Sequence, residues 1–385
     1  MSATEKPLSI YVHIPFCVKK CLYCDFLSAP AGREKQKDYV KALLQEIKEE
    51  SRQYKQYLVN TIFIGGGTPS LLLGEEILQI MGTLRECYRL DASCEISMEV
   101  NPGTVTEEKA LCWKKAGINR ISMGLQSAID KELQALGRIH SSADFFESYE
   151  KLVKSGFNNI NIDLMSAIPY QTIDSYQQTL KKVTELIPSP VHLSAYSLII
   201  EENTPFYDNC PSLPDEDTER EMYKITDDIF SGCGYERYEI SNYAKPGYEC
   251  RHNQVYWKRG DYVGFGLGSA SLVENVRFHN CTDMERYMKG CESGVSVKED
   301  IQNLTIEEQM EEFMFLGLRM MQGISCLEFL DCFGKSVDEV YPGIVDKFVN
   351  MGLLVRTCRK EEEWIALTKQ GIDVSNQIMA EFLLS

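Results

Sequence analysis

The chain has 385 residues, of which 44% are hydrophobic and 25% charged, and this ordinary globular composition excludes a disordered or fibrous protein. Its 57 acidic residues outnumber the 40 basic ones, so a net charge of −17 disfavours nucleic acid as a partner. No run of 18 apolar residues predicts a membrane span, and the opening MSATEKPLSI lacks the apolar block of a signal peptide. We therefore expect a cytoplasmic chain whose fourteen cysteines are reduced.

Three cysteines follow the first predicted strand, which covers residues 9–15 and ends at a proline. Cys17, Cys21 and Cys24 have the spacing Cys-x-x-x-Cys-x-x-Cys, and no fourth Cys or His follows them at metal-ligand spacing in the sequence. A structural zinc site needs four ligands, whereas three thiolates can bind a [4Fe–4S] cluster and leave its fourth iron open. We predict such a cluster. Reduced loop thiols, or half of a zinc site shared between two chains, are the alternatives.

From Ser9 to about Ile200, short apolar runs alternate with longer amphipathic stretches, a pattern typical of βα units around a parallel sheet. The apolar runs predict strands at 9–15, 60–65, 95–100, 119–125, 159–165 and 192–198. The amphipathic stretches predict helices at about 34–57, 74–87, 106–116, 142–156 and 172–187. Because the carboxyl ends of parallel strands meet at one edge of a sheet, we expect functional side chains just after each strand.

Several of these predicted strand ends carry glycine or polar side chains. The turn at 65–70 opens with three glycines, which let backbone N–H groups approach a ligand, although many such turns hold none. Glu99, Gln126 and Asp163 follow or lie in later strands, and each could bind amines or hydroxyls or could simply cap a strand end. Arg138 could pair with a carboxylate or be an exposed arginine at a helix end.

The pattern changes after the sixth strand, where an acidic helix is predicted at about 215–232. The segment CRHNQVYW at 250–257 then places a histidine among aromatic residues. His252 is by default an ordinary core or surface histidine. Beside Tyr256 and Trp257, however, it also has the chemistry of an axial haem ligand, a neutral nitrogen donor between flat apolar walls.

Apolar residues recur at helical spacing from Leu304 onward. Further helices are predicted at 325–332, 337–352 and 367–384, with a small hairpin formed by 353–356 and 364–367. This order is typical of winged-helix modules, many of which bind DNA, but the three glutamates at 361–363 give the predicted wing the wrong charge. A structural lid or a protein-docking surface is the better interpretation.

The cysteine motif, with Tyr23 before its last cysteine, resembles the radical S-adenosylmethionine (SAM) superfamily. More narrowly, HIPFCVKKCLYCDF, IFIGGGTPS, NIDLMSAIP, YEISNYA and HNQVYW resemble its oxygen-independent coproporphyrinogen III oxidase-like branch, over nearly the whole chain. The resemblance implies an α/β fold, a partial (β/α)6 TIM-like barrel with a mainly helical, winged-helix-like C-terminal domain. We expect a radical SAM core at 1–235, a connecting segment at 236–303 and the C-terminal domain at 304–385.

The resemblance also implies which residues bind ligands. SAM would occupy the open iron of the cluster, and its carried-over contacts are Tyr11, Tyr23, Gly67, Thr68, Glu99, Gln126, Arg138, Asp163 and Ala195. Among these, sequence pattern alone supports Gly67 and, loosely, Glu99. Haem would be held near His252, with Asn253, Tyr256 and Trp257 forming its pocket.

Two departures separate the chain from the true oxidase of this branch. The oxidase motif continues to a fourth cysteine where this chain has Phe26, and the oxidase has a long arm before its cysteines, whereas 16 residues precede Cys17. These departures argue against the oxidase, and Phe26 together with the motif at 252–257 resembles instead the haem chaperones of this branch. That resemblance implies a protein that uses the cluster and SAM to transfer haem to apo-haemoproteins, with membrane respiratory proteins as recipients and a homodimer as the assembly.

Two other classes of function stay open, and no catalytic residue is assigned. One is a radical SAM enzyme acting on a tetrapyrrole, either the oxidase or an anaerobic haem-degrading methyltransferase. The other is a non-catalytic regulator that uses the winged-helix region.

Overall fold

The structure is a computed structural model that describes residues 6–384. Its main body is built on six parallel strands that pair in chain order, as the apolar runs predict. These strands are β1 (Lys6–Ile14), β2 (Tyr57–Gly66), β3 (Leu90–Val100), β4 (Arg120–Gln126), β5 (Ile160–Ser166) and β6 (His192–Ser197). The α/β fold with a row of six parallel strands is therefore confirmed.

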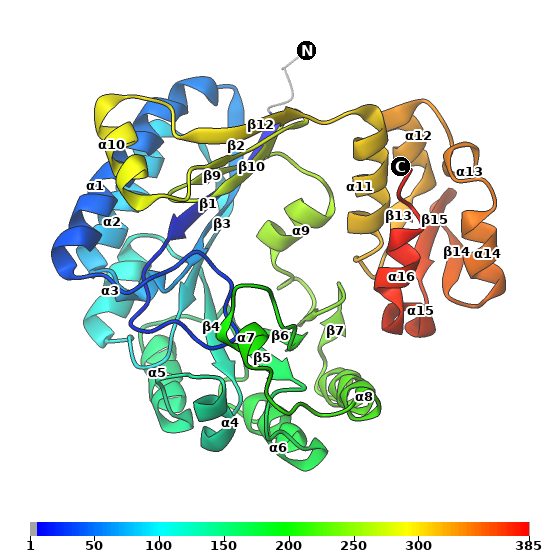
Figure 1. Ribbon diagram of the computed structural model, residues 1–385, viewed down its shortest axis with the longest axis horizontal. Coiled ribbons are helices and arrows are strands. Elements are labelled where there is room, and N and C mark those ends of the chain that lie inside the picture. Colours follow the sequence, from blue (N-terminus) through cyan, green and yellow to red (C-terminus); the bar gives the residue numbers. More distant parts are fainter. Residues whose placement is uncertain (1–5, 385) are drawn as a thin grey trace.

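Helices cover the outer side of these strands (Figure 1). They are α1 (Arg33–Glu50), α2 (Gly74–Cys87), α3 (Glu107–Lys115), α4 (Asp130–Ala135), α5 (Ser142–Lys154), α6 (Ile173–Thr184) and α8 (Glu216–Gly232). The first helix was predicted too long, because the chain leaves α1 through a short 3₁₀ turn at Ser51–Gln53 and β2 already begins at Tyr57. The six residues of α4 are too few to show a helical period, so the sequence did not predict it.

The segment 236–303, which we expected as a connection, extends both edges of the sheet. Next to β6 it adds β8 (Asn242–Ala244) and β7 (Glu236–Arg237), which are antiparallel. At the other edge β9 (Tyr262–Phe265) pairs parallel to β1, and three antiparallel strands follow it. These are β10 (Ala270–Val273), β11 (Val276–Asn280) and β12 (Lys298–Asn303), with α10 (Met284–Ser293) between the last two.

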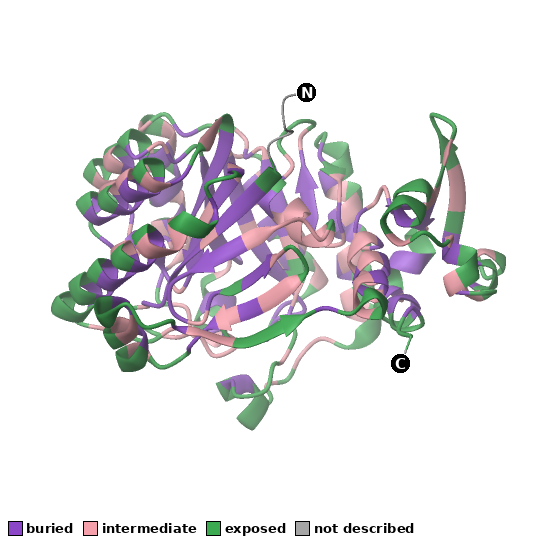
Figure 2. Cartoon of the chain, turned by 90° about the horizontal axis from the view of Figure 1, so that it is seen from above, coloured by how far each residue is buried: buried purple, intermediate pink, exposed green. Residues whose placement is uncertain are grey.

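The two faces of the parallel strands differ in chemistry, and Figure 2 shows the strands buried beneath more exposed helices. On β1 the buried apolar side chains Ile10 and Val12 belong to the main hydrophobic core. The alternate residues face the inside of the curved sheet, where the Thr61 hydroxyl donates to the Ser9 hydroxyl at 2.7 Å and Tyr11 lines a cavity. The sheet therefore encloses polar groups on its inner side.

Between β6 and β9 the chain forms two short helices, α7 (Pro205–Asp208) and α9 (Arg251–Trp257). Figure 1 shows α9 in the open side of the curved sheet, between the main body and the C-terminal domain. Its position brings the predicted haem motif to the inner side of the sheet.

The C-terminal domain has its own hydrophobic core and a three-stranded antiparallel sheet. Its elements are α11 (Ile306–Gly317), β13 (Ile324–Ser325), α12 (Cys326–Phe333), α13 (Val337–Val340), α14 (Ile344–Asn350), β14 (Leu354–Arg359), β15 (Glu362–Leu367), α15 (Lys369–Asp373) and α16 (Ser375–Ala380). The predicted hairpin is thus β14 and β15. None of the helices in residues 6–384 has the length and apolarity needed to cross a membrane.

Candidate functional site

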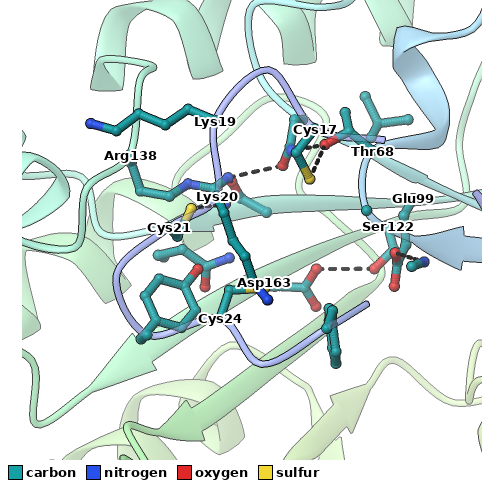
Figure 3. Close-up of a pocket in the computed structure, with 18 residues that line it drawn as sticks. Cys17, Lys19, Lys20, Cys21, Cys24, Thr68, Glu99, Ser122, Arg138 and Asp163 are labelled. Carbon is teal, nitrogen blue, oxygen red and sulfur yellow. Dashed lines mark hydrogen bonds between the residues drawn. The ribbon is translucent and has the colours of Figure 1, made fainter. Parts of the chain in front are cut away.

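The three predicted cluster ligands lie together on the loop that follows β1. Cys17, Cys21 and Cys24 all line one cavity of about 140 Å³ at the carboxyl ends of the strands, as Figure 3 shows. The loop is fixed by backbone hydrogen bonds, from Cys17 N–H to the Ala29 carbonyl at 3.2 Å and from Leu22 N–H to the Leu136 carbonyl at 3.0 Å. The spacing of the cysteines therefore places three sulfur donors at one site.

The donor set fits three corners of a [4Fe–4S] cluster. The lining of the cavity contains no fourth cysteine and no histidine. Over residues 6–384, no three His, Cys, Asp or Glu side chains converge as a single metal ion requires. A zinc ion needs its ligands around one centre, whereas the thiolates of a cubane bind three different irons and stand farther apart. Three sulfur donors on one loop thus suffice for three corners of such a cluster.

Two side chains contact the cysteine sulfurs, Thr68 from the end of β2 and Arg138 from the loop after α4. The Thr68 hydroxyl lies 3.5 Å from Cys17 Sγ, and Arg138 Nη1 lies 3.7 Å from Cys21 Sγ. Asn101 joins the two, because its amide donates to Thr68 Oγ1 at 2.7 Å and its oxygen accepts from Arg138 Nη2 at 2.9 Å. Arg138 is therefore a partly buried partner of the cysteine loop, not an exposed helix-end arginine.

Gly67 directly follows β2 and lies against the start of the cysteine loop. A Cβ atom at this position would stand 2.7 Å from the Phe16 carbonyl oxygen and 2.9 Å from the Ile14 carbonyl oxygen. Both neighbours are backbone atoms that cannot turn aside, so only glycine permits this close approach. The Gly67 N–H in turn donates to the Ile14 carbonyl at 2.8 Å.

Gly67→Ala should therefore displace the cysteine loop and strongly reduce the iron bound after anaerobic reconstitution. Iron analysis and visible absorbance measure this loss. The matched control is Gly82→Ala in α2, where a Cβ meets nothing within 4 Å, and this control should bind iron as the wild type does while gaining about 0.5–1 kcal/mol of stability. Normal iron content in Gly67→Ala would show that the loop tolerates the shift.

Most of the predicted SAM contacts surround the same cavity. Its lining includes Tyr23, Gly67, Thr68, Glu99, Gln126, Arg138 and Asp163. Tyr11 lines the neighbouring larger cavity, and Ala195 is part of neither lining. Asn101, Ser122 and Gly124 line the site but were not predicted. A polar residue directly after the predicted strand 95–100 was the available signal for Asn101, whereas Ser122 lies in the middle of the predicted strand 119–125 and had none.

Gln126 ends β4 in a left-handed backbone conformation, with φ of 69°. This conformation is costly for a residue with a side chain, and such strain concentrates at ligand sites. Its side chain lies against Gly124, where an added Cβ would meet the Gln126 amide at 2.9 Å. The strand end is thus shaped to place an amide at the cavity wall.

Two partly buried carboxyl groups, Glu99 and Asp163, face the cavity. Burial and the nearby Asp163 raise the pKa of Glu99 to about 8, although a hydrogen bond from the Gly66 N–H at 2.9 Å opposes the rise. Burial also raises the pKa of Asp163, which accepts hydrogen bonds from Ser122 at 3.1 Å and from Asn161 at 2.8 Å. At neutral pH Glu99 is therefore largely protonated, and a cationic ligand group would favour its ionised form.

Because the pKa of Glu99 is raised, the effect of Glu99→Gln on the free energy of unfolding should depend on pH. Above the unfolded value of 4.5 and up to about 8, the unfolded chain has lost a proton that the folded chain keeps, so the free energy of unfolding falls as pH rises. Glutamine removes this penalty, so the variant without cluster should be more stable than the wild type at pH 8.5 by about 4–5 kcal/mol, and similar to it near pH 4.5.

Urea unfolding at the two pH values measures this difference. The control is Glu185→Gln, an exposed position after α6, which should show no pH-dependent gain. A Glu99→Gln variant with the same stability difference from wild type at both pH values would contradict the assignment of a protonated Glu99.

A larger cavity of about 560 Å³ adjoins the cluster side. It shares Tyr23, Phe26, Glu99, Ser122, Gln126 and Asp163 with the smaller cavity. It continues along the inner side of the sheet to α9, where His252, Asn253 and Tyr256 line it. The predicted SAM residues and three of the four predicted haem residues therefore face connected space.

His252 is buried, with 1% of its surface exposed, and both ring nitrogens have partners. Nδ1 lies 2.7 Å from Thr61 Oγ1, Nε2 lies 2.8 Å from the Tyr256 hydroxyl, and the ring stacks on Phe63 with centroids 5.2 Å apart. Burial, together with the positive charge of Arg120, lowers the pKa of His252 to about 3. The imidazole is thus neutral. Its Nε2 could bind a metal once the hydrogen bond to Tyr256 is broken.

Trp257 lies on a different side of α9 from the cavity. Its ring stacks on the Arg319 guanidinium, 4.3 Å from the ring centroid, and it is not part of the cavity lining. Arg319 follows α11, so Trp257 joins α9 to the C-terminal domain. The structure therefore places this predicted haem residue at a domain contact.

A carboxylate of the sheet fixes the start of α9. Glu95 on β3 accepts hydrogen bonds from the backbone N–H groups of Arg251 at 3.1 Å and His252 at 3.0 Å. These groups have no partner within the helix, and a negative charge at a helix start is favourable. Glu95 thus holds the haem motif against the sheet, a role that nothing in the local sequence indicates.

Family models match both parts of the chain. The model described as the radical SAM superfamily matches residues 11–183, and the HemN C-terminal domain model matches residues 304–374. The second match begins where we expected the C-terminal domain.

Similar proteins of known name share the whole length of the chain. The haem chaperone HemW of Bacillus subtilis is 36% identical, over 97% of this chain and 99% of that protein. HemW of Escherichia coli is 36% identical over 98% of each, and HemW of Lactococcus lactis is 33% identical over 99% and 98%. Among solved structures, coproporphyrinogen III oxidase HemN of Escherichia coli covers 99% of this chain and 91% of its own, with a TM-score of 0.83 at 24% identity. The HemN likeness supports the fold.

Proposed function

The chain belongs to the radical SAM superfamily, in the family of the haem chaperone HemW, and on that premise we propose that it binds haem and transfers it to apo-haemoproteins. The superfamily uses a [4Fe–4S] cluster and SAM, which Cys17, Cys21 and Cys24 and the polar strand ends would hold. When bound, the cluster supplies one-electron chemistry.

The observation that carries the proposal is the connection between the two cavities. The cavity at the cysteine loop and the larger cavity at α9 share Glu99, Gln126 and Asp163 in their linings. Flat aromatic side chains, including Tyr11, Phe63 and Tyr256, line the larger one, as a planar apolar ligand requires. A haem at His252 would therefore share its space with the SAM site, so occupation of one site would affect the other.

The chain's residues would act on haem by binding and release. In the structure the Tyr256 hydroxyl lies 2.8 Å from His252 Nε2. Haem binding through this nitrogen would break the hydrogen bond, and haem release would restore it. The neutral imidazole needs no proton loss before it binds a metal. Such an exchange lowers the net affinity for haem, which suits a carrier that must give up its ligand.

A handover experiment tests the proposal. Haem-loaded protein is mixed anaerobically with an apo-cytochrome acceptor, and the absorbance of the acceptor's haem-bound form is followed. Direct transfer predicts a rate that rises with acceptor concentration. A rate independent of acceptor concentration would mean passive release and would contradict a chaperone role.

Turnover assays distinguish a haem chaperone from the tetrapyrrole enzymes of the same branch. Phe26 lines both cavities at the position of the oxidase's fourth motif cysteine, so we propose that oxidase activity is absent. Anaerobic incubation with coproporphyrinogen III, SAM and a reductant should release no carbon dioxide above background. Methyl transfer from labelled SAM to haem should likewise be absent.

Finer features of the proposal rest on the family resemblance. We propose that recipients include membrane respiratory proteins and that the chain forms a homodimer, which sedimentation with and without haem would test. We also propose that it works in a reducing compartment such as the cytoplasm, because all fourteen cysteines are free. The division into a core at 1–235, a segment at 236–303 and a C-terminal domain at 304–385 remains our proposal.

A further inference from the structure

The larger cavity has a buried cation in its wall. Arg120 is the first residue of β4, has 2% of its surface exposed, and is part of the cavity lining. Gln126, at the other end of the same strand, lies near the cysteine loop, and six residues of strand separate the two by about 20 Å. Arg120 therefore stands at the end of the cavity remote from the cluster.

The guanidinium of Arg120 has no counter-ion in direct contact. Among the described residues no ion pair or side-chain hydrogen bond involves it, and its Nε is buried without a partner. The acidic groups whose charge it senses are Glu95 and Asp163. Glu95 already accepts the N–H groups of α9, and Asp163 already accepts from Ser122 and Asn161. Leaving a buried charge unpaired is costly, so an anion in the cavity would offset that cost.

We propose that Arg120 binds a carboxylate of the ligand that occupies the larger cavity. The inference rests on the proposed function, under which that carboxylate is a haem propionate. The guanidinium offers up to five N–H donors in a planar fork that matches a carboxylate. Besides burial, the positive charge of Arg120 lowers the pKa of His252, so the two side chains lie near each other. The residue proposed to bind the carboxylate and the residue proposed to bind the iron therefore lie at the same end of the cavity.

The carboxylate would meet few competing negative charges at this end. The acidic residues in the cavity lining are Asp25, Glu99, Asp163 and Glu201. Glu99, at the carboxyl end of β3, is largely protonated at neutral pH. Asp163 is held by hydrogen bonds from its own and the neighbouring strand. Arg120 is the one positively charged residue in that lining, so it is the position where an anionic group would bind.

A purely structural role makes a different prediction. If Arg120 only balanced Glu95 and so stabilised α9, its loss would weaken every ligand of the cavity equally. If it binds a propionate, its loss would weaken only ligands that carry a free carboxylate. The two roles are therefore separated by comparing haem with haem dimethyl ester, in which both propionates are blocked.

Anaerobic absorbance titrations of the full chain with these two ligands test the proposal. The wild type should bind haem at least about 10-fold more tightly than the dimethyl ester. Arg120→Met should weaken haem binding by about 10-fold to 100-fold while leaving the affinity for the ester within about 2-fold. Arg120→Lys keeps the charge without the fork and should give an intermediate preference.

Equal weakening of both ligands in Arg120→Met, or a wild type without preference, would overturn the assignment. Should Arg120→Met fail to fold, Arg120→Lys decides alone: a reduced preference for haem supports the proposal and an unchanged one overturns it. Binding of neither ligand by the wild type would contradict the proposed haem function itself, and with it the propionate assignment.

Discussion

Cys21→Ser should leave the reconstituted protein without the visible absorbance of an iron–sulfur cluster. A serine hydroxyl replaces the thiolate with a poor iron ligand, and a cubane held by Cys17 and Cys24 alone lacks one of its three protein bonds. No other cysteine or histidine lines the cavity, so no nearby side chain can take the vacated place. Bound iron should fall from about four atoms per chain to below about one.

The control for this variant is Cys233→Ser, an exposed cysteine after α8 and outside the cavity. It should reconstitute like the wild type, so that a difference between the two variants reports the ligand role and not the number of thiols. Unchanged iron and sulfide content in Cys21→Ser would remove this residue from the cluster.

His252→Ala should lower haem affinity at least about 10-fold, because the variant lacks the nitrogen that would bind the iron. Tyr256→Phe should do the reverse. It removes the hydroxyl that lies 2.8 Å from His252 Nε2, so the ring no longer loses a hydrogen bond when it binds iron, and haem affinity should rise by about 3-fold to 10-fold. Opposite signs from two residues of one helical turn would indicate competition for one nitrogen.

Haem titrations followed by absorbance measure both variants, with His279→Ala on β11, a partly exposed position outside both cavities, as the histidine control. Because His252 is buried against Phe63, thermal unfolding of each variant must show that the alanine variant is folded at the titration temperature. Unaltered haem affinity in folded His252→Ala would place the iron ligand elsewhere. Weaker binding in Tyr256→Phe would mean that the hydroxyl contacts haem itself.

The sequence predicted those parts of the fold that are encoded locally. Most of the six parallel strands contain a short run of buried apolar residues, and the helices between them carry a clear period. The short helices α4, α7 and α9 have too few residues for a period and depend on tertiary contacts such as Glu95 at the start of α9. The strand β9 was missed because it pairs with β1, some 250 residues earlier in the chain, and β10 to β12 extend the sheet from β9.

The site was predicted as far as its residues sit in recognisable motifs. The cysteine spacing and Gly67 led to the cluster loop, and the end of the third strand led to Glu99, whereas Asp163 came from the family resemblance. The sequence could not show that Tyr256 caps His252, because the contact depends on how α9 is held against the sheet. It also could not separate Trp257, which packs on the C-terminal domain, from the aromatic residues that face the cavity.

The most direct test of the account is a haem titration of the cluster-loaded wild type, carried out anaerobically with and without SAM. The account predicts saturable binding of one haem per chain and an affinity that changes when SAM is added, because the two cavities share Glu99, Gln126 and Asp163. Failure to bind haem at either SAM concentration, or binding that SAM leaves unaltered, would contradict a haem site that shares its space with the cluster.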